Sequence, residues 1–115
     1  LMHLQIYNQR PEIKGVVHTH SPAATAFAYL SRKILPINPE STLFLADLPI
    51  IPFKPFGSKE LADEVGNHLR EANAGLLAKH GVITIGPTLD HAFHLAELVE
   101  ETALMNLYVQ MLQMK

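Results

Sequence analysis

The chain has 115 residues, 48% of them apolar, which suits one packed domain rather than a disordered segment. A formal net charge of −2 and nine scattered Lys and Arg residues speak against a nucleic-acid partner, and no apolar run is long enough to suggest a membrane span. The absence of cysteine excludes disulfides and thiolate ligands, so any bound metal must take nitrogen or oxygen ligands. This composition is compatible with a reducing cytoplasm, and we expect a cytoplasmic protein.

The chain begins in what reads as the middle of a helix. Apolar side chains recur at helical spacing in this first segment, at Met2, Ile6 and Tyr7. The helix should end near Arg10, because Pro11 disfavours helical geometry in the residue before it. No helix start signal precedes the stripe and the first residue is Leu1, so we expect an N-terminal part of the domain to be missing from this chain.

The next segment joins a strand to a helix. Residues 13–17 are rich in β-branched side chains, which is typical of a buried strand. Because side chains two positions apart on a strand point the same way, His18 and His20 should share a face. Ser21 should then cap a short helix over residues 22–30, whose first residue is proline.

The middle of the chain predicts a loop and one short strand. Residues 34–39 contain two prolines and read as a loop or an edge segment, while the sequence leaves the type of the segment 40–46 open. Residues 47–53 read as an edge strand, because Pro49 and Pro52 cannot donate hydrogen bonds to a neighbouring strand.

A helix, two short strands and a long helix should complete the chain. Ser58 is the expected N-cap of the first helix, which residues 73–75 should end. Its predicted buried stripe comprises Leu61, Val65 and Leu69. The strands are expected over residues 76–78 and 82–85, on either side of His80 and Gly81.

The final helix, capped by Thr88, should run over residues 89–113. Its core face is predicted from three- and four-residue spacing and comprises Leu89, Phe93, Ala96, Val99, Ala103 and Leu107. Three of its glutamates read as a solvated face or an interface: Glu97, Glu100 and Glu101. Helices interleaved with strands predict an α/β domain, and the prolines and the tight turn at His80 favour a mixed or largely antiparallel sheet.

Three histidines are candidate metal ligands. The pair His18 and His20 is a weak signal by itself, because the chain contains seven histidines. His80 stands in a matching position, where an apolar run meets glycine, and three neutral imidazoles with one open position form the arrangement of a catalytic zinc. The other histidines read as ordinary helix residues: His3, His68, His91 and His94.

Five separated motifs of the chain match one known family. They are Met2-His-Leu-Gln-Ile-Tyr-Asn-Gln-Arg-Pro-Glu12, Val16-Val-His-Thr-His-Ser-Pro22, Phe56-Gly-Ser-Lys-Glu-Leu-Ala62, Lys79-His-Gly-Val82 and Ala92-Phe-His-Leu-Ala-Glu-Leu-Val-Glu-Glu-Thr-Ala103. In this order, and essentially from end to end, they resemble the class II aldolase/adducin family. The resemblance implies a three-layer α/β/α sandwich around a mainly antiparallel sheet, with residues 1–115 as the C-terminal portion of the domain, and a homotetramer.

Within the family the chain looks most similar to the L-fuculose-phosphate aldolase-like members, which cleave a phosphorylated ketose to dihydroxyacetone phosphate and an aldehyde. By the resemblance, His18, His20 and His80 bind one zinc ion per subunit, which stabilises the enediolate left when the carbon bond breaks. The acid/base glutamate of these aldolases is expected upstream of Leu1, so this chain alone should be nearly inactive. Glu40 is a weaker candidate for that role, and Phe56 either lines the substrate cleft or packs in the core.

Two alternative functions stay open at this point. One is a sibling enzyme of the family, namely a sugar-phosphate epimerase, dehydratase or decarboxylase. The other is a non-catalytic module of adducin type, which would not need the metal ligands. In the enzyme readings the partner is a small phosphorylated sugar, and neither a nucleic acid nor a membrane is expected.

Overall fold

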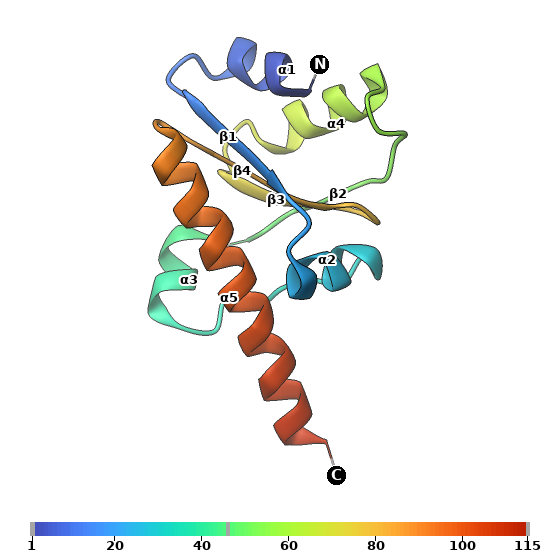
Figure 1. Cartoon of the computed structure of the whole chain (residues 1–115), viewed down its shortest axis with the longest axis vertical. Helices are drawn as coiled ribbons and strands as arrows, with labels where there is room; N and C mark the ends of the chain where they lie inside the picture. Colours follow the sequence, from blue (N-terminus) through green and yellow to red (C-terminus); the bar gives the residue numbers. More distant parts are fainter. Residues whose placement is uncertain (1, 46, 115) are drawn as a thin grey trace.

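The computed structural model describes residues 2–45 and 47–114, so Leu1, Ala46 and Lys115 lie outside the description. Along the chain the elements are α1 (Met2–Gln9), β1 (Gly15–Thr19), α2 (Pro22–Tyr29), α3 (Pro39–Phe44), β2 (Ile50–Ile51), α4 (Lys59–His68), β3 (Ala74–Leu77), β4 (Gly81–Gly86) and α5 (Leu89–Gln113). Figure 1 shows how the helices surround the strands.

The strands form a sheet in the order β1-β4-β3-β2. β4 lies between β1 and β3 and pairs antiparallel with both, with Val16 of β1 opposite Ile85. β2 pairs parallel with β3 at the edge of the sheet, between Pro49 and Pro52. Prolines are tolerated there because an edge strand needs hydrogen bonds on one side only. The mainly antiparallel sheet is confirmed, and the edge strand is confirmed at Ile50–Ile51 but is shorter than the predicted residues 47–53.

Helices cover both faces of the sheet. α1 and α4 lie on one face, and α2, α3 and α5 lie on the other (Figure 1). Alternation along β4 builds the core on both sides, because Val82 packs with residues of α2 and α5 while Ile83 and Ile85 pack with those of α1 and α4. The three-layer α/β/α arrangement is therefore confirmed.

The final helix buries a different stripe from the one predicted. Ala96, Val99 and Ala103 are buried as expected, but the exposed fractions of Leu89, Phe93 and Leu107 are 60%, 51% and 39%. The buried positions that the prediction missed are Ala92, Leu95, Leu98, Thr102 and Asn106. The buried face is rotated about the helix axis relative to the predicted one, so that it includes Leu95 and Leu98 while Phe93 faces away from the sheet. Across residues 2–45 and 47–114, no helix is both long and apolar enough to cross a membrane.

Several element boundaries also differ from the prediction. β1 begins at Gly15 and reaches Thr19, so His18 lies inside the strand. The segment whose type was open is largely the helix α3, which Asn38 caps by accepting a hydrogen bond from the Ser41 N–H at 2.8 Å. The break predicted over residues 73–75 overlaps the start of β3, because Ala74 and Gly75 pair with β4.

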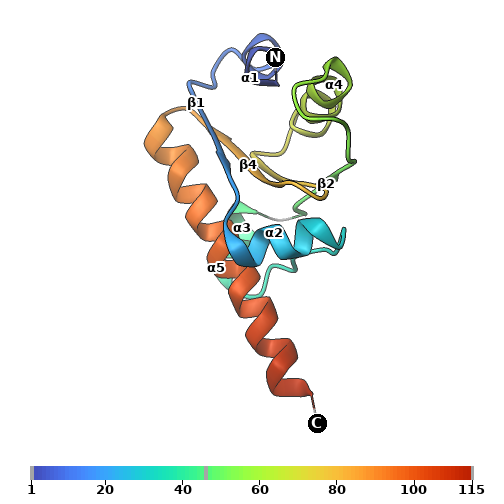
Figure 2. The same ribbon diagram turned by 45° about the vertical axis from the view of Figure 1, so that its right-hand side comes forward.

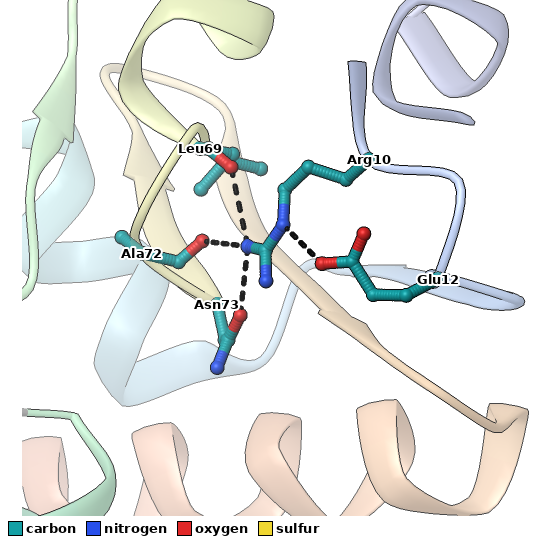
Figure 3. Close-up of polar contacts among 5 residues, drawn as sticks. All are labelled: Arg10, Glu12, Leu69, Ala72 and Asn73. Carbon is teal, nitrogen blue, oxygen red and sulfur yellow. Dashed lines mark hydrogen bonds and ion pairs between the residues drawn. The ribbon is translucent and has the colours of Figure 1, made fainter. Parts of the chain in front are cut away.

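Arg10 fastens the end of α1 to the end of α4 (Figure 3). Its guanidinium donates to the carbonyl oxygens of Leu69 and Ala72 at 3.3 and 3.0 Å and to Asn73 Oδ1 at 2.9 Å. A fourth bond, 2.9 Å long, joins Arg10 Nε to Glu12 Oε2. Because a guanidinium has five donors in a fixed plane, one residue can hold two chain segments together.

Candidate metal centre

The antiparallel pairing of β1 with β4 brings the three predicted ligands together. His18 lies opposite Ile83. One further residue pair ends the ladder of β1 with β4, next to the hairpin between β3 and β4 that carries His80. His20 follows one residue beyond β1 and points to the same side as His18. One ring nitrogen from each of the three imidazoles lies within 4.8 Å of the others.

The rings themselves are closely grouped. The ring centroids of His18 and His80 are 4.7 Å apart, those of His18 and His20 are 4.9 Å apart, and those of His20 and His80 are 5.0 Å apart. His18 and His80 are partly buried, whereas His20 is exposed. These distances would allow the three imidazoles to bind one metal ion.

Two backbone features of the hairpin between β3 and β4 allow the three rings to lie this close together. Lys79 adopts a left-handed conformation with φ of 62°, which turns the chain sharply before His80. At Gly81, a Cβ atom would overlap the Thr19 carbonyl oxygen and lie 2.9 Å from His20 Cδ2. Glycine at this position therefore lets the end of β1 and the His20 ring lie against the hairpin.

The electrostatics of the site favour neutral imidazoles. Burial, followed by the nearby His80, His20 and His3, lowers the pKa of His18 from 6.5 to about 4. Burial and then His20 lower the pKa of His80. His18 Nε2 is a buried nitrogen atom without a hydrogen-bond partner among the described residues. A divalent ion would supply the missing partner, so the donor set fits a metal. That the three histidines bind a metal stays a prediction.

A cavity of about 230 Å³ opens beside His18. It is lined by Met2, His3, His18, Phe56, Gly57, Ser58 and Leu61. The Phe56 ring is 71% exposed and lies edge-on to His80 at a centroid distance of 4.9 Å. Phe56 therefore packs against the histidine group and not within the core, which was the alternative reading of this residue.

Other candidate residues lie apart from the three imidazoles. Glu40, in the first turn of α3, is exposed and lines a different hollow together with His91 and His94. Among the described residues, the potential metal-binding group contains three histidines and no carboxylate. The structure thus does not bring Glu40 to the imidazoles within this chain. His3, which the sequence read as an ordinary helix residue, lies at the cavity beside His18.

The cap of α2 was predicted wrongly. Ser21 occupies the N-cap position, but its side chain accepts no capping hydrogen bond. Instead, the Glu100 carboxylate reaches across from α5 and accepts hydrogen bonds from the N–H groups of Ala23 and Ala24 at 3.0 and 2.8 Å. Glu100 is therefore not simply part of a solvated face. No local pattern around α2 indicates a cap from a residue 77 positions away.

Comparison with known proteins gives one consistent family. The family model "Class II Aldolase and Adducin N-terminal domain" matches residues 1–107. An L-fuculose phosphate aldolase from Methanococcus vannielii is 39% identical over 105 residues, which are 91% of this chain and 57% of the relative. A 3-oxo-tetronate 4-phosphate decarboxylase from Escherichia coli is 34% identical over 90% of this chain and 51% of its own length.

A solved structure shares the fold. The L-fuculose-1-phosphate aldolase from Thermus thermophilus superposes with a TM-score of 0.89 at 28% sequence identity, covering 97% of this chain and 60% of the other. The chain thus spans between about half and three fifths of the length of these relatives.

Proposed function

The chain belongs to the class II aldolase and adducin family, and we propose that it supplies the metal centre of a zinc-dependent aldolase. The proposed substrate is a phosphorylated ketose similar to L-fuculose 1-phosphate, and the products are dihydroxyacetone phosphate and an aldehyde. The observation that carries this proposal is the convergence of three imidazoles from two distant parts of the chain. The relative from Methanococcus vannielii supports the reaction class.

In this proposal His18, His20 and His80 hold one zinc ion through their ring nitrogens. The low pKa of His18 keeps its nitrogen lone pair free for binding at neutral pH. A bound zinc ion would polarise the ketose carbonyl and stabilise the enediolate produced by carbon–carbon cleavage. Because imidazole ligands are neutral, they leave the full charge of the ion for that anion.

The remaining parts of the site follow from the cavity beside His18. The Phe56 ring covers one side of the histidine group and would limit the access of water to it. Met2 and Leu61 give the cavity an apolar wall, against which the carbon chain of a small sugar could lie. The proton-transfer group is proposed to be a glutamate upstream of Leu1, because the described histidine group contains no carboxylate.

We also propose that the active form is a homotetramer. Large apolar side chains remain exposed along the half of α5 that extends away from the sheet (Figure 2), at Met105, Leu107, Tyr108, Met111 and Leu112. Their burial between subunits would remove this apolar surface from water.

Two competing functions have distinct signatures. The Escherichia coli relative is named as a decarboxylase, so a sibling reaction at the same metal centre is the second candidate. A decarboxylase would release carbon dioxide from a 3-oxo acid phosphate and would share the metal requirement. A non-catalytic module of adducin type would instead bind no metal at the three histidines.

The first test is metal binding by the purified chain. After treatment with a chelator, titration with Zn²⁺ in competition with a chromogenic chelator should show one ion bound per chain. His18→Ala and His80→Ala should each weaken binding more than about 100-fold, which exceeds the cost of losing a residue that only orients a ligand. His94→Ala, on the exposed face of α5, is the matched control and should bind like the parent.

The second test is the reaction of a protein in which a segment carrying the proposed glutamate precedes this chain. With zinc bound, it should release dihydroxyacetone phosphate from L-fuculose 1-phosphate, and His18→Ala should abolish the release. If the protein instead releases carbon dioxide from 3-oxo-tetronate 4-phosphate, the proposed aldolase function is wrong and a decarboxylase function takes its place. Absence of zinc binding would favour the non-catalytic module. The 115-residue chain alone should bind zinc but show almost no cleavage.

A further inference from the structure

We infer that Glu100 is a positioning residue for the His20 imidazole, although it lies on α5 and outside the three-histidine group. The inference deepens the proposed function, since it concerns how the same metal centre is assembled. It rests on the two hydrogen bonds between the Glu100 carboxylate and the first turn of α2, and on the absence of any sheet pairing at His20.

Glu100 accepts hydrogen bonds from the two N–H groups in the first turn of α2 that have no partner within the helix. Pro22, the first helical residue, has no N–H group, and the next two donors, on Ala23 and Ala24, bind Glu100 Oε2 and Oε1 at 3.0 and 2.8 Å. The Thr25 N–H already donates within the helix, to the Ser21 carbonyl oxygen at 2.9 Å. A carboxylate at the positive end of a helix dipole is favourable, so this contact fixes the beginning of α2 on α5.

We call this contact between Glu100 and the first turn of α2 the clamp. A short, stiff segment connects the clamp to His20. Only Ser21 and Pro22 separate His20 from Ala23. The proline ring fixes its own φ and restricts the backbone of the residue before it, so little freedom remains between the clamped turn and the His20 backbone. Figure 2 shows β1 running directly into the start of α2 beside α5.

The other two histidines do not depend on this clamp in the same way. His18 lies within β1 and is held by the pairing with Ile83 of β4. His80 lies on the hairpin, where its N–H donates to the Leu77 carbonyl oxygen at 2.9 Å. His20 follows the last residue of β1 and has no partner in the β1–β4 ladder. Among the three, His20 is thus the one whose position is set by α2.

The test is a double-mutant cycle on zinc affinity. Glu100→Gln keeps the size of the side chain but removes its charge and one acceptor, and it should weaken zinc binding about tenfold, within the range for residues that orient ligands. In a His20→Ala background the same substitution should change the affinity by less than about twofold, because the ring that Glu100 positions is gone. Glu101→Gln, on the exposed side of the same helix, is the control and should have no effect in either background.

A second measurement keeps the inference testable without metal. In the metal-free protein, ring-proton NMR signals of His20 should shift and broaden in Glu100→Gln, while those of His80 stay unchanged. If the parent chain binds no zinc, the proposed metal centre fails, but these NMR signals still report on Glu100. Equal losses of zinc affinity with and without His20, or an unchanged His20 signal, would overturn the inference.

Moving the cap of α2 from Glu100 to another residue distinguishes the positioning of His20 from the stabilisation of the helix. Ser21→Asp added to Glu100→Ala places a carboxylate at the N-cap of α2 without a link to α5. The double variant should recover the Tm of the parent but neither its zinc affinity nor its His20 signal. Recovery of all three would mean that Glu100 only caps the helix, which contradicts the inference.

Discussion

The three histidines of the candidate metal centre differ in how far they are removed from water. The effect on the pKa is large for His18, because burial and the neighbouring His80, His20 and His3 lower it from 6.5 to about 4. In the unfolded chain the same imidazole takes up a proton near pH 6.5. His18 therefore stabilises the folded chain fully above that pH, and this contribution decreases as the pH falls from about 6.5 to about 4.

The pH dependence of the metal-free protein should reveal this difference. In the presence of a chelator, the free energy of unfolding in urea should fall more between pH 7.5 and pH 4 for the parent than for His18→Gln, which cannot take up a proton there. The comparison removes the contribution of the carboxylates, which both proteins share. Equal decreases in the two proteins would show that His18 keeps an ordinary pKa in the fold.

At the scale of elements, Asn106 connects the loop after α2 to α5. Its side-chain oxygen accepts from the Leu35 N–H at 2.9 Å, and its nitrogen donates to the carbonyl oxygens of Leu35 and Thr102 at 2.9 and 2.7 Å. Asn106 itself is buried, its bond to Thr102 is buried as well, and its two bonds to Leu35 are partly buried. The loop is thereby held on a helix that is distant in sequence.

Asn106→Leu should consequently destabilise the chain by about 1–3 kcal/mol, because two backbone groups of Leu35 lose their partners. Urea unfolding measures the change. Asn67→Leu, on the exposed surface of α4, is the matched control and should stay within about 0.5 kcal/mol of the parent. A loss no larger than in the control would mean that the loop detaches from α5 at little cost.

At the scale of the whole molecule, the candidate metal centre links parts of the chain that are far apart in sequence. Its histidines come from β1, from the residue that leads into α2 and from the hairpin between β3 and β4. A ligand that binds only the folded chain stabilises it by about 2.7 kcal/mol when its free concentration is a hundred times its Kd. Zinc binding should therefore stabilise the entire domain and not one loop.

Thermal unfolding tests this linkage. Saturating zinc should raise the Tm of the parent chain by roughly 10 °C, as expected for a domain of this size. His80→Ala should show almost no increase, whereas His94→Ala should respond like the parent. A similar increase in His80→Ala would indicate that zinc binds elsewhere on the folded chain.

The sequence by itself determined most of the elements, although not α3, and it identified the candidate ligands. Local patterns were sufficient because hydrophobic periodicity, proline and cap residues act within a few positions: the end of α1 near Arg10 and the caps at Ser58 and Thr88 are as predicted. The strand period also put His18 and His20 on one side. Matching motifs along the chain then predicted the family and the layered fold.

The tertiary structure decided what depends on contacts between distant segments. The register of β1 against β4 brings His80 to the end of β1, and no local pattern encodes that register. The buried stripe of α5 was mispredicted because apolar residues occur on more than one side of this helix, and only its packing on the sheet decides that Leu95 is buried while Phe93 stays exposed. The cap of α2 comes from Glu100, 77 positions from Ala23, since a free N–H group binds whichever acceptor the folded chain brings within reach.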